Sequence, residues 1–179
     1  IALNRQQVDV GRASAYLKIS DGCSAPCAFC TIPSFKGLNR SRPREHILAE
    51  ARRLAQAGTK EIIIIAQDTT AYGRDWGELD GLPSLLEQIV AAAPEVDWIR
   101  LMYFYPMYIS DELIAAITSA RRVLPYIDMP LQHASDNMLK RMARLYDTAK
   151  YRDMVREARE AIPHLALASD WITGFPTET

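Results

Sequence analysis

The sequence has few cysteines and no long apolar run, and both absences restrict the class of protein. Its 179 residues hold three cysteines, and an odd number does not suggest a framework of paired disulfides. No signal peptide is visible, and the longest apolar run, residues 62–66, is far too short to cross a bilayer. We therefore expect a cytoplasmic protein with no membrane association.

A strong charge of either sign is also missing. Lysine and arginine total 21 against 22 acidic residues, which gives a formal net charge of -1. This balance does not favour a nucleic-acid-binding surface or an acidic disordered tail. With 49% hydrophobic and 24% charged residues, the composition is that of an ordinary globular domain with a sizeable core.

Two kinds of apolar segment alternate along the chain. Strand-like segments cover residues 15–19, 61–66, 98–103, 126–129 and 165–172, and helical patterns cover residues 43–57, 82–93, 111–121, 137–143 and 151–161. Four consecutive isoleucines at positions 62–65 predict a strand that is buried on both faces, as in a parallel sheet.

This alternation of strands and helices implies an α/β fold with parallel strands joined by right-handed crossovers. No glycine-rich nucleotide loop follows the first strand. A partial (β/α) TIM-like barrel with outer helices is therefore favoured, and an open doubly wound sheet remains the alternative. In such barrels the reactive groups lie in the loops at the carboxyl ends of the strands. Those loops hold Cys23, Cys27 and Cys30, Gln67 and Asp68, residues 103–105, Gln132 and His133, and residues 173–178.

The three cysteines form one short motif, Cys23-Ser-Ala-Pro-Cys27-Ala-Phe-Cys30. Thiolates on one loop can converge on a single centre, and these soft ligands favour iron–sulfur or zinc over hard cations. A cubane cluster normally takes four cysteines, and the chain has only three, so one iron would keep an open and reactive position. The alternative is a structural zinc site with His46 or Asp21 as the fourth ligand.

The cysteine spacing, with an aromatic residue just before the last cysteine, resembles the signature of the radical S-adenosylmethionine (SAM) superfamily. The resemblance implies a [4Fe–4S] cluster on Cys23, Cys27 and Cys30, with SAM bound through its amino and carboxylate groups at the open iron. In that superfamily, reduction of the cluster cleaves SAM to a 5′-deoxyadenosyl radical, while the protein positions the cofactor and excludes water.

Further motifs are similar to those of the methylthiotransferase family. They lie at residues 16–23, 41–43, 67–73, 130–133 and 174–176. Within the family, Gln-Asp-Thr at 67–69, Tyr-Gly at 72–73 and Gln-His at 132–133 resemble the branch that modifies a ribosomal protein. Two positions depart from this pattern: Ser169-Asp170 resembles the branch that modifies tRNA, and Thr177 stands where the family commonly has glycine.

The same resemblance implies a longer protein around this chain. Family members have an N-terminal domain with three more cysteines and a second [4Fe–4S] cluster, a radical SAM barrel of six strands, and a small C-terminal β domain that binds the substrate. The chain begins at Ile1 and stops at Thr179. We interpret residues 1–14 as a linker from a missing N-terminal domain, and residues 15–179 as a radical SAM core truncated at its C-terminal end.

Residue roles follow from the resemblance as well. Phe29 would lie beside the adenine of SAM, and Gln67 and Asp68 near its methionine end, where a carboxylate is suited to pair with the ammonium group. Gln132, Ile172 and Thr173 would line the rest of the SAM pocket. Asp68 could instead cap the turn after its strand.

The remaining polar and aromatic residues have plainer interpretations. His133 is more often structural than catalytic at such a position. The aromatic residues at 103–105 serve either barrel packing or a contact with the substrate. The basic run Arg40, Arg42 and Arg44 is more typical of a solvated face than of a contact with an acidic substrate or with SAM.

The implied activity is the transfer of a methylthio group to the β-carbon of an aspartate in small-subunit ribosomal protein number twelve. The implied electron donor is flavodoxin or ferredoxin, and we expect a monomer. One alternative is a tRNA adenosine methylthiotransferase. Another is a non-catalytic iron–sulfur or zinc-binding module, against which the open coordination position argues.

Overall fold

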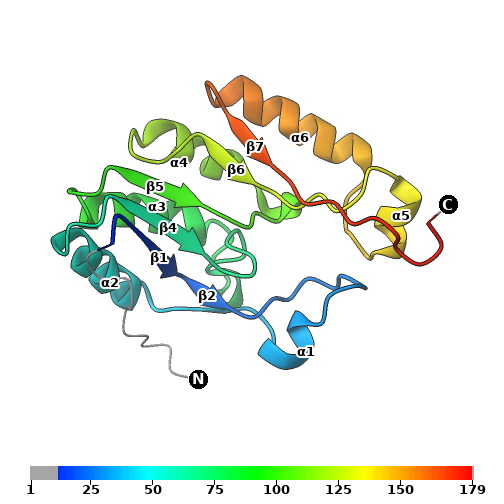
Figure 1. Ribbon diagram of the computed structural model, residues 1–179, viewed down its shortest axis with the longest axis horizontal. Coiled ribbons are helices and arrows are strands. Elements are labelled where there is room, and N and C mark those ends of the chain that lie inside the picture. The colour runs from blue at the N-terminus through cyan, green and yellow to red at the C-terminus, as the bar shows by residue number, and fades with distance from the viewer. Residues whose placement is uncertain (1–11, 179) are drawn as a thin grey trace.

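Five parallel strands form one curved layer in the computed structural model, which describes residues 12–178 (Figure 1). β1 (Ser14–Lys18), β4 (Glu61–Ile65) and β5 (Trp98–Leu101) form a sheet in that order. β6 (Tyr126–Asp128) pairs with β7 (Ala166–Ala168), and a parallel bridge between Ile99 and Val123 links β5 to the segment before β6. Within the described residues β1 and β7 do not pair, so the structure confirms the prediction of a partial barrel.

Four amphipathic helices cover the outer face of this layer. They are α2 (Arg44–Gln56), α3 (Gly81–Ala92), α4 (Asp111–Ser119) and α6 (Thr148–Ala161). Each contacts the next in chain order, and α2 also packs on β1 (Figure 1). The predicted helices all exist with ends within a few residues of those expected, and α5 (Asp136–Arg141) is the shortest of them.

Several short elements were not predicted. They are β2 (Ser20–Asp21) and β3 (Arg40–Ser41), which pair antiparallel, the helix α1 (Ile32–Lys36), and the 3-10 turns η1 (Arg74–Trp76) and η2 (Pro106–Tyr108). None is long enough to show a hydrophobic period, which is why sequence patterns do not reveal them.

The prediction that the isoleucine strand is buried on both faces is wrong. Ile62 and Ile64 are fully buried under the helices, whereas Ile63 and Ile65 are only half-buried. β1 shows the same alternation, since Leu17 is buried and Tyr16 is 52% exposed. The helices cover one face of the sheet, and the described residues leave the concave face partly open.

Two strands are shorter than predicted because the backbone leaves the extended conformation. The strand expected at 98–103 ends at Leu101, and Tyr103 has a φ of 61°. The strand expected at 165–172 covers only Ala166–Ala168, after which pairing with the β6 side resumes as a single bridge between Gln132 and Trp171. Gln132 has a φ of 75°, which no regular strand can hold.

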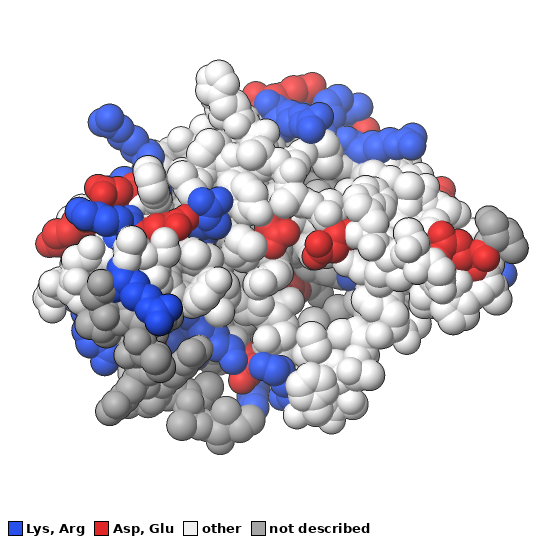
Figure 2. Space-filling view, in the orientation of Figure 1, with Lys and Arg blue, Asp and Glu red and all other residues white. Residues whose placement is uncertain are grey.

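The face drawn in Figure 2 carries no continuous basic field. Lysine and arginine side chains are scattered toward its edges, and a few acidic side chains lie in its otherwise largely uncharged middle. Between residues 12 and 178, no helix combines the length and apolarity that crossing a membrane requires.

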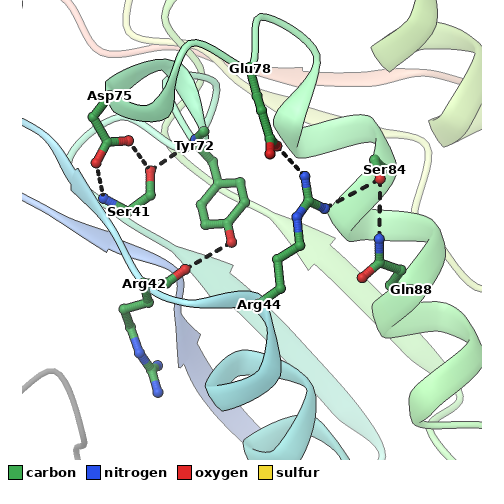
Figure 3. A network of polar contacts seen from close by, with 9 residues as sticks. Ser41, Arg42, Arg44, Tyr72, Asp75, Glu78, Ser84 and Gln88 are labelled. Carbon is green, nitrogen blue, oxygen red and sulfur yellow. Dashed lines mark hydrogen bonds and ion pairs between the residues drawn. The ribbon is translucent and has the colours of Figure 1, made fainter.

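The arginine run at positions 40–44 is not simply a solvated face. Arg42 is 5% exposed and pairs with Glu50 of α2. Arg44 binds Glu78, which precedes α3, and Ser84 within α3 (Figure 3). The phenol of Tyr72 donates to the Arg42 carbonyl at 2.8 Å. These contacts fasten the loop after β4 to the start of α2, and only Arg40 is exposed.

Breaking the buried ion pair should destabilise the fold strongly. Nη2 of Arg42 lies 2.7 Å from Oε2 of Glu50, and the side chains are 6% and 4% exposed. Glu50→Gln leaves a buried guanidinium without its counter-charge, so we expect the free energy of unfolding in urea to fall by about 3 kcal/mol.

The matched control is Asp97→Asn in the Lys60–Asp97 pair, where both side chains are 60% exposed. That change should alter the free energy of unfolding by less than about 0.5 kcal/mol. Equal losses in the two variants would contradict the assigned role of the buried pair.

Candidate functional site

One cavity of about 150 Å³ lies where the loops after the strands meet. The segments after β1, β4, β5 and β6 all contribute to its wall, as the parallel topology requires. The predicted site residues among its lining are Cys23, Cys27, Cys30, Phe29, Gln67, Asp68 and Gln132. Ile172 and Thr173 are not part of the lining, although the Ile172 amide donates to the Gln132 carbonyl at 2.8 Å.

The cysteine loop is anchored at its first turn. Gly22 has a φ of 77°, and a Cβ there would lie 2.2 Å from the Leu38 carbonyl oxygen, so only glycine fits. The Gly22 amide donates to Oε1 of Gln67 at 2.9 Å, which ties the loop to the end of β4. Gln67 was predicted only as a residue near SAM, and the structure shows that it also has a structural role, because it anchors the cysteine loop.

The loop is also anchored in its middle. The Ala28 amide donates to the Met142 carbonyl at 2.9 Å, just after α5. Nη1 of Arg144 donates to Sγ of Cys27 at 3.1 Å. The cysteine loop thus packs against a segment more than a hundred positions away.

The three thiols are unpaired and partly exposed. Burial raises the pKa of Cys23, and the nearby Asp68, Cys27 and Cys30 raise it further. A metal that binds the sulfur would offset this effect, because it stabilises the thiolate.

The donor set has the chemistry that a cluster needs. The three thiols line one cavity, and a cubane takes soft thiolates, each at a different iron. Among residues 12–178, no group of three His, Cys, Asp or Glu side chains has an arrangement that could hold a metal ion in this structure. Of the two residues considered as a fourth zinc ligand, His46 is exposed on α2 and Asp21 pairs with Lys18 and Lys36.

Asp68 is 4% exposed at the end of β4. Its carboxylate accepts hydrogen bonds from the Thr70 hydroxyl and, at 3.1 Å, from the Ala71 amide, so it caps the turn. Burial raises its pKa to about 6, although these bonds act in the opposite direction. Asp68 also lines the cavity, so it is placed for both of the roles considered from the sequence.

Two lining residues have a left-handed backbone that their side chains disfavour. Tyr103 has a φ of 61° and Gln132 a φ of 75°. The Tyr103 amide donates to the Asp128 carboxylate at 3.2 Å, and its carbonyl accepts from Thr69. Bonds to neighbouring loops hold this conformation and leave the ring of Tyr103 43% exposed at the cavity.

His133 has a structural role in this arrangement. Its Nδ1 accepts from the Ser135 amide at 3.0 Å, so Nε2 carries the proton and donates to Glu178 at 3.0 Å. This bond lowers the pKa of Glu178 and holds the loop at residues 174–178. In that loop Thr177 has a φ of 74°, a conformation that favours the glycine expected there.

Sequence reasoning missed several lining residues, chiefly Arg144, Pro130, Ala25 and Ile32. No local signal identifies Arg144, because it contacts Cys27 across 117 positions of sequence.

The sequence was compared with models of known protein families. The family model described as "Radical SAM superfamily" matches residues 17–179. The chain belongs to the radical SAM superfamily. Membership implies a [4Fe–4S] cluster and SAM, in agreement with three thiols at one cavity.

Curated relatives of this radical SAM chain carry the methylthiotransferase name that the motifs predicted. The chain is 54% identical over 166 residues to "Ribosomal protein uS12 methylthiotransferase RimO" from Roseiflexus castenholzii, covering 93% of this chain and 34% of that protein. The protein of the same name from Geobacter sulfurreducens is 50% identical over 168 residues, covering 93% and 37%. The chain thus spans about a third of the length of these relatives.

Solved radical SAM structures share the fold. The methyltransferase TsrM from Kitasatospora setae, with tryptophan and a SAM analogue bound, superposes with a TM-score of 0.72 at 17% identity, covering 93% of this chain and 32% of TsrM. The radical enzyme OxsB, with aqua-cobalamin and SAM bound, gives a TM-score of 0.62 at 15% identity, covering 87% and 23%. Both likenesses concern the fold, and they confirm the radical SAM type of partial barrel.

Asp68 should make the stability of this chain depend on pH. Its pKa is 3.8 in an ordinary environment and about 6 here, so the folded chain keeps a proton that the unfolded chain releases. The stability that this proton contributes is present below about pH 4 and is lost as the pH rises through 6. Relative to wild type, Asp68→Asn should therefore gain about 2 kcal/mol of unfolding free energy between pH 4 and pH 7.

Urea denaturation of the metal-free chain across this pH range measures the effect, with Asp97→Asn as the exposed control. Asp68→Asn also loses hydrogen bonds to the carboxylate. This loss shifts its curve of unfolding free energy against pH by a constant amount and does not change the slope of that curve. Parallel curves for wild type and Asp68→Asn would show that burial does not raise this pKa.

Proposed function

We propose that this chain is the radical SAM core of a methylthiotransferase that modifies an aspartate of ribosomal protein uS12. The observation that carries the proposal is 54% identity, over 93% of the chain, to a protein named for that activity. The cavity supports it, because the predicted cluster ligands and most of the predicted SAM contacts share one wall.

Cys23, Cys27 and Cys30 would hold the cluster and leave one iron open to SAM. When bound, the cluster supplies the electron that cleaves SAM into methionine and a hydrogen-abstracting radical. The chain's own contribution is to hold the thiols in place through the Gly22–Gln67 and Arg144–Cys27 bonds.

The SAM contacts follow from the lining. Asp68 is suited to the ammonium group, and that cation would in turn favour the ionised carboxylate and lower its raised pKa. Phe29 would lie along the adenine, and Gln67 near the methionine end. Gln132, with Ile172 and Thr173 behind its strained backbone, would complete the pocket.

The substrate chemistry requires a radical. The β-carbon of an aspartate carries an unactivated C–H bond, which acid–base groups cannot break at a useful rate. We infer that residues 15–179 supply this step, while an N-terminal domain reached through residues 1–14 brings the second [4Fe–4S] cluster and sulfur. The enzyme would act as a cytoplasmic monomer, with flavodoxin or ferredoxin as electron donor.

The alternative substrate is a tRNA adenosine, which Ser169-Asp170 favours by resemblance. In the structure, Ser169 Oγ accepts from the Leu131 amide and the Asp170 carbonyl accepts from the Gln132 amide. Both contacts support the backbone around Gln132. Ser169 and Asp170 therefore have a structural role that does not depend on whether the substrate is a protein or a tRNA.

Anaerobic reconstitution with iron and sulfide, followed by electron paramagnetic resonance of the reduced chain, tests the cluster site. We expect a cubane signal that changes when SAM is added. Replacing any of the three cysteines by alanine should abolish it, whereas Ser34→Ala, on the exposed face of α1, should not. A zinc-only protein, or a signal indifferent to SAM, would favour the non-catalytic module.

Mass spectrometry of uS12 peptides and tRNA nucleosides, after incubation with the full-length enzyme, tests the substrate. We expect a methylthio group on the uS12 aspartate and unmodified tRNA. The 179-residue chain alone should cleave SAM without forming product, because the proposed second cluster would be absent. Methylthiolated nucleoside would select the tRNA alternative, and product from the short chain would refute the need for a second cluster.

A further inference from the structure

Every nitrogen of the Arg144 guanidinium donates a hydrogen bond. Nη1 donates to Sγ of Cys27 at 3.1 Å, Nη2 to the Pro130 carbonyl at 2.7 Å, and Nε to the Tyr146 hydroxyl at 2.9 Å. The side chain therefore joins the cysteine loop to the segment between β6 and Gln132. A group fixed at three points has a defined distance to the sulfur.

Two aromatic rings frame the same guanidinium. Its central carbon lies 4.7 Å from the ring centroid of Tyr105 and 5.1 Å from that of Tyr146. The Tyr146 hydroxyl donates to the Leu131 carbonyl at 2.8 Å and is itself buried. The rings cover part of the cation, which reduces the solvent screening between its charge and the sulfur.

The charges at the cavity are distributed unequally. Among its described lining residues, Arg144 is the only lysine or arginine and Asp68 the only carboxylate. Asp68 acts on Cys23, and Arg144 contacts Cys27. The three thiols of one motif thus have different electrostatic surroundings.

We propose that Arg144 acts through Cys27 to raise the reduction potential of the cluster. This inference rests on the proposed function, since it requires Cys27 to be a ligand. Reduction adds a negative charge to the cluster, and a nearby cation with an N–H···S hydrogen bond stabilises the reduced state more than the oxidised one. Arg144 is in this sense a positioning and tuning residue that does not itself contact the substrate.

Redox titration of the reconstituted chain, followed by electron paramagnetic resonance, measures this effect directly. Arg144→Gln keeps an N–H donor but loses the charge, and Arg144→Lys keeps the charge but loses the planar fork. At the wild-type midpoint potential, we expect the ratio of reduced to oxidised cluster to fall about tenfold in Arg144→Gln, which is 59 mV for one electron. Arg144→Lys should show a smaller fall in the same direction.

The control is Arg122→Gln, since Arg122 is also half-buried and binds the carbonyls of Val90, Ala93 and Val96, away from the cavity. It should leave the midpoint potential unchanged. Wild-type potentials in both Arg144 variants would overturn the proposal. If neither variant binds iron although both unfold at the wild-type temperature, Arg144 serves cluster assembly, and the tuning role is also overturned.

Failure of the proposed function gives a different result. In that case the wild-type chain itself forms no SAM-responsive cluster. A cluster that responds to SAM but keeps its potential in the Arg144 variants would leave the proposed function intact and remove only this inference.

Discussion

Parallel pairing of β1 with β4 and of β4 with β5 brings the carboxyl ends of three strands to one edge. Lys18 lies opposite Ile65, and Ile64 opposite Leu101, so the strands end nearly level. The helices occupy the outer face and leave this edge to the loops (Figure 1). Residues that are distant in sequence therefore meet there, and the site depends on this alignment more than on any single contact.

The loops at this edge cannot continue the sheet, and their backbone groups bond to one another instead. Tyr103 and Gln132 leave the extended conformation, and each is held by a neighbouring loop through Asp128, Thr69 or the carbonyl of Asp170. Such strain persists only where the surrounding structure fixes the backbone. The result is a cavity wall that is ordered without regular secondary structure, as a cofactor site requires.

The polar groups of the cavity divide into an acidic and a basic part. Asp68 is a buried carboxylate whose raised pKa makes it responsive to any cation that approaches. Arg144 is a cation already paired with a thiol sulfur and framed by two tyrosines. The cavity therefore presents a carboxylate at one place and a cation, bonded to a thiol, at another.

The sequence alone determined the order of strands and helices, because hydrophobic periodicity is a local property. It also determined the three-thiol motif and its position after the first strand, because ligand spacing is local as well. Asp68 was also predictable as a polar residue that ends a buried strand. The half-burial of Ile63 and Ile65 was not, since it depends on which face of the sheet the helices cover. Only the tertiary structure decided the partners of Gln67, His133 and Arg144, because each bonds to a segment many positions away that folding alone brings near.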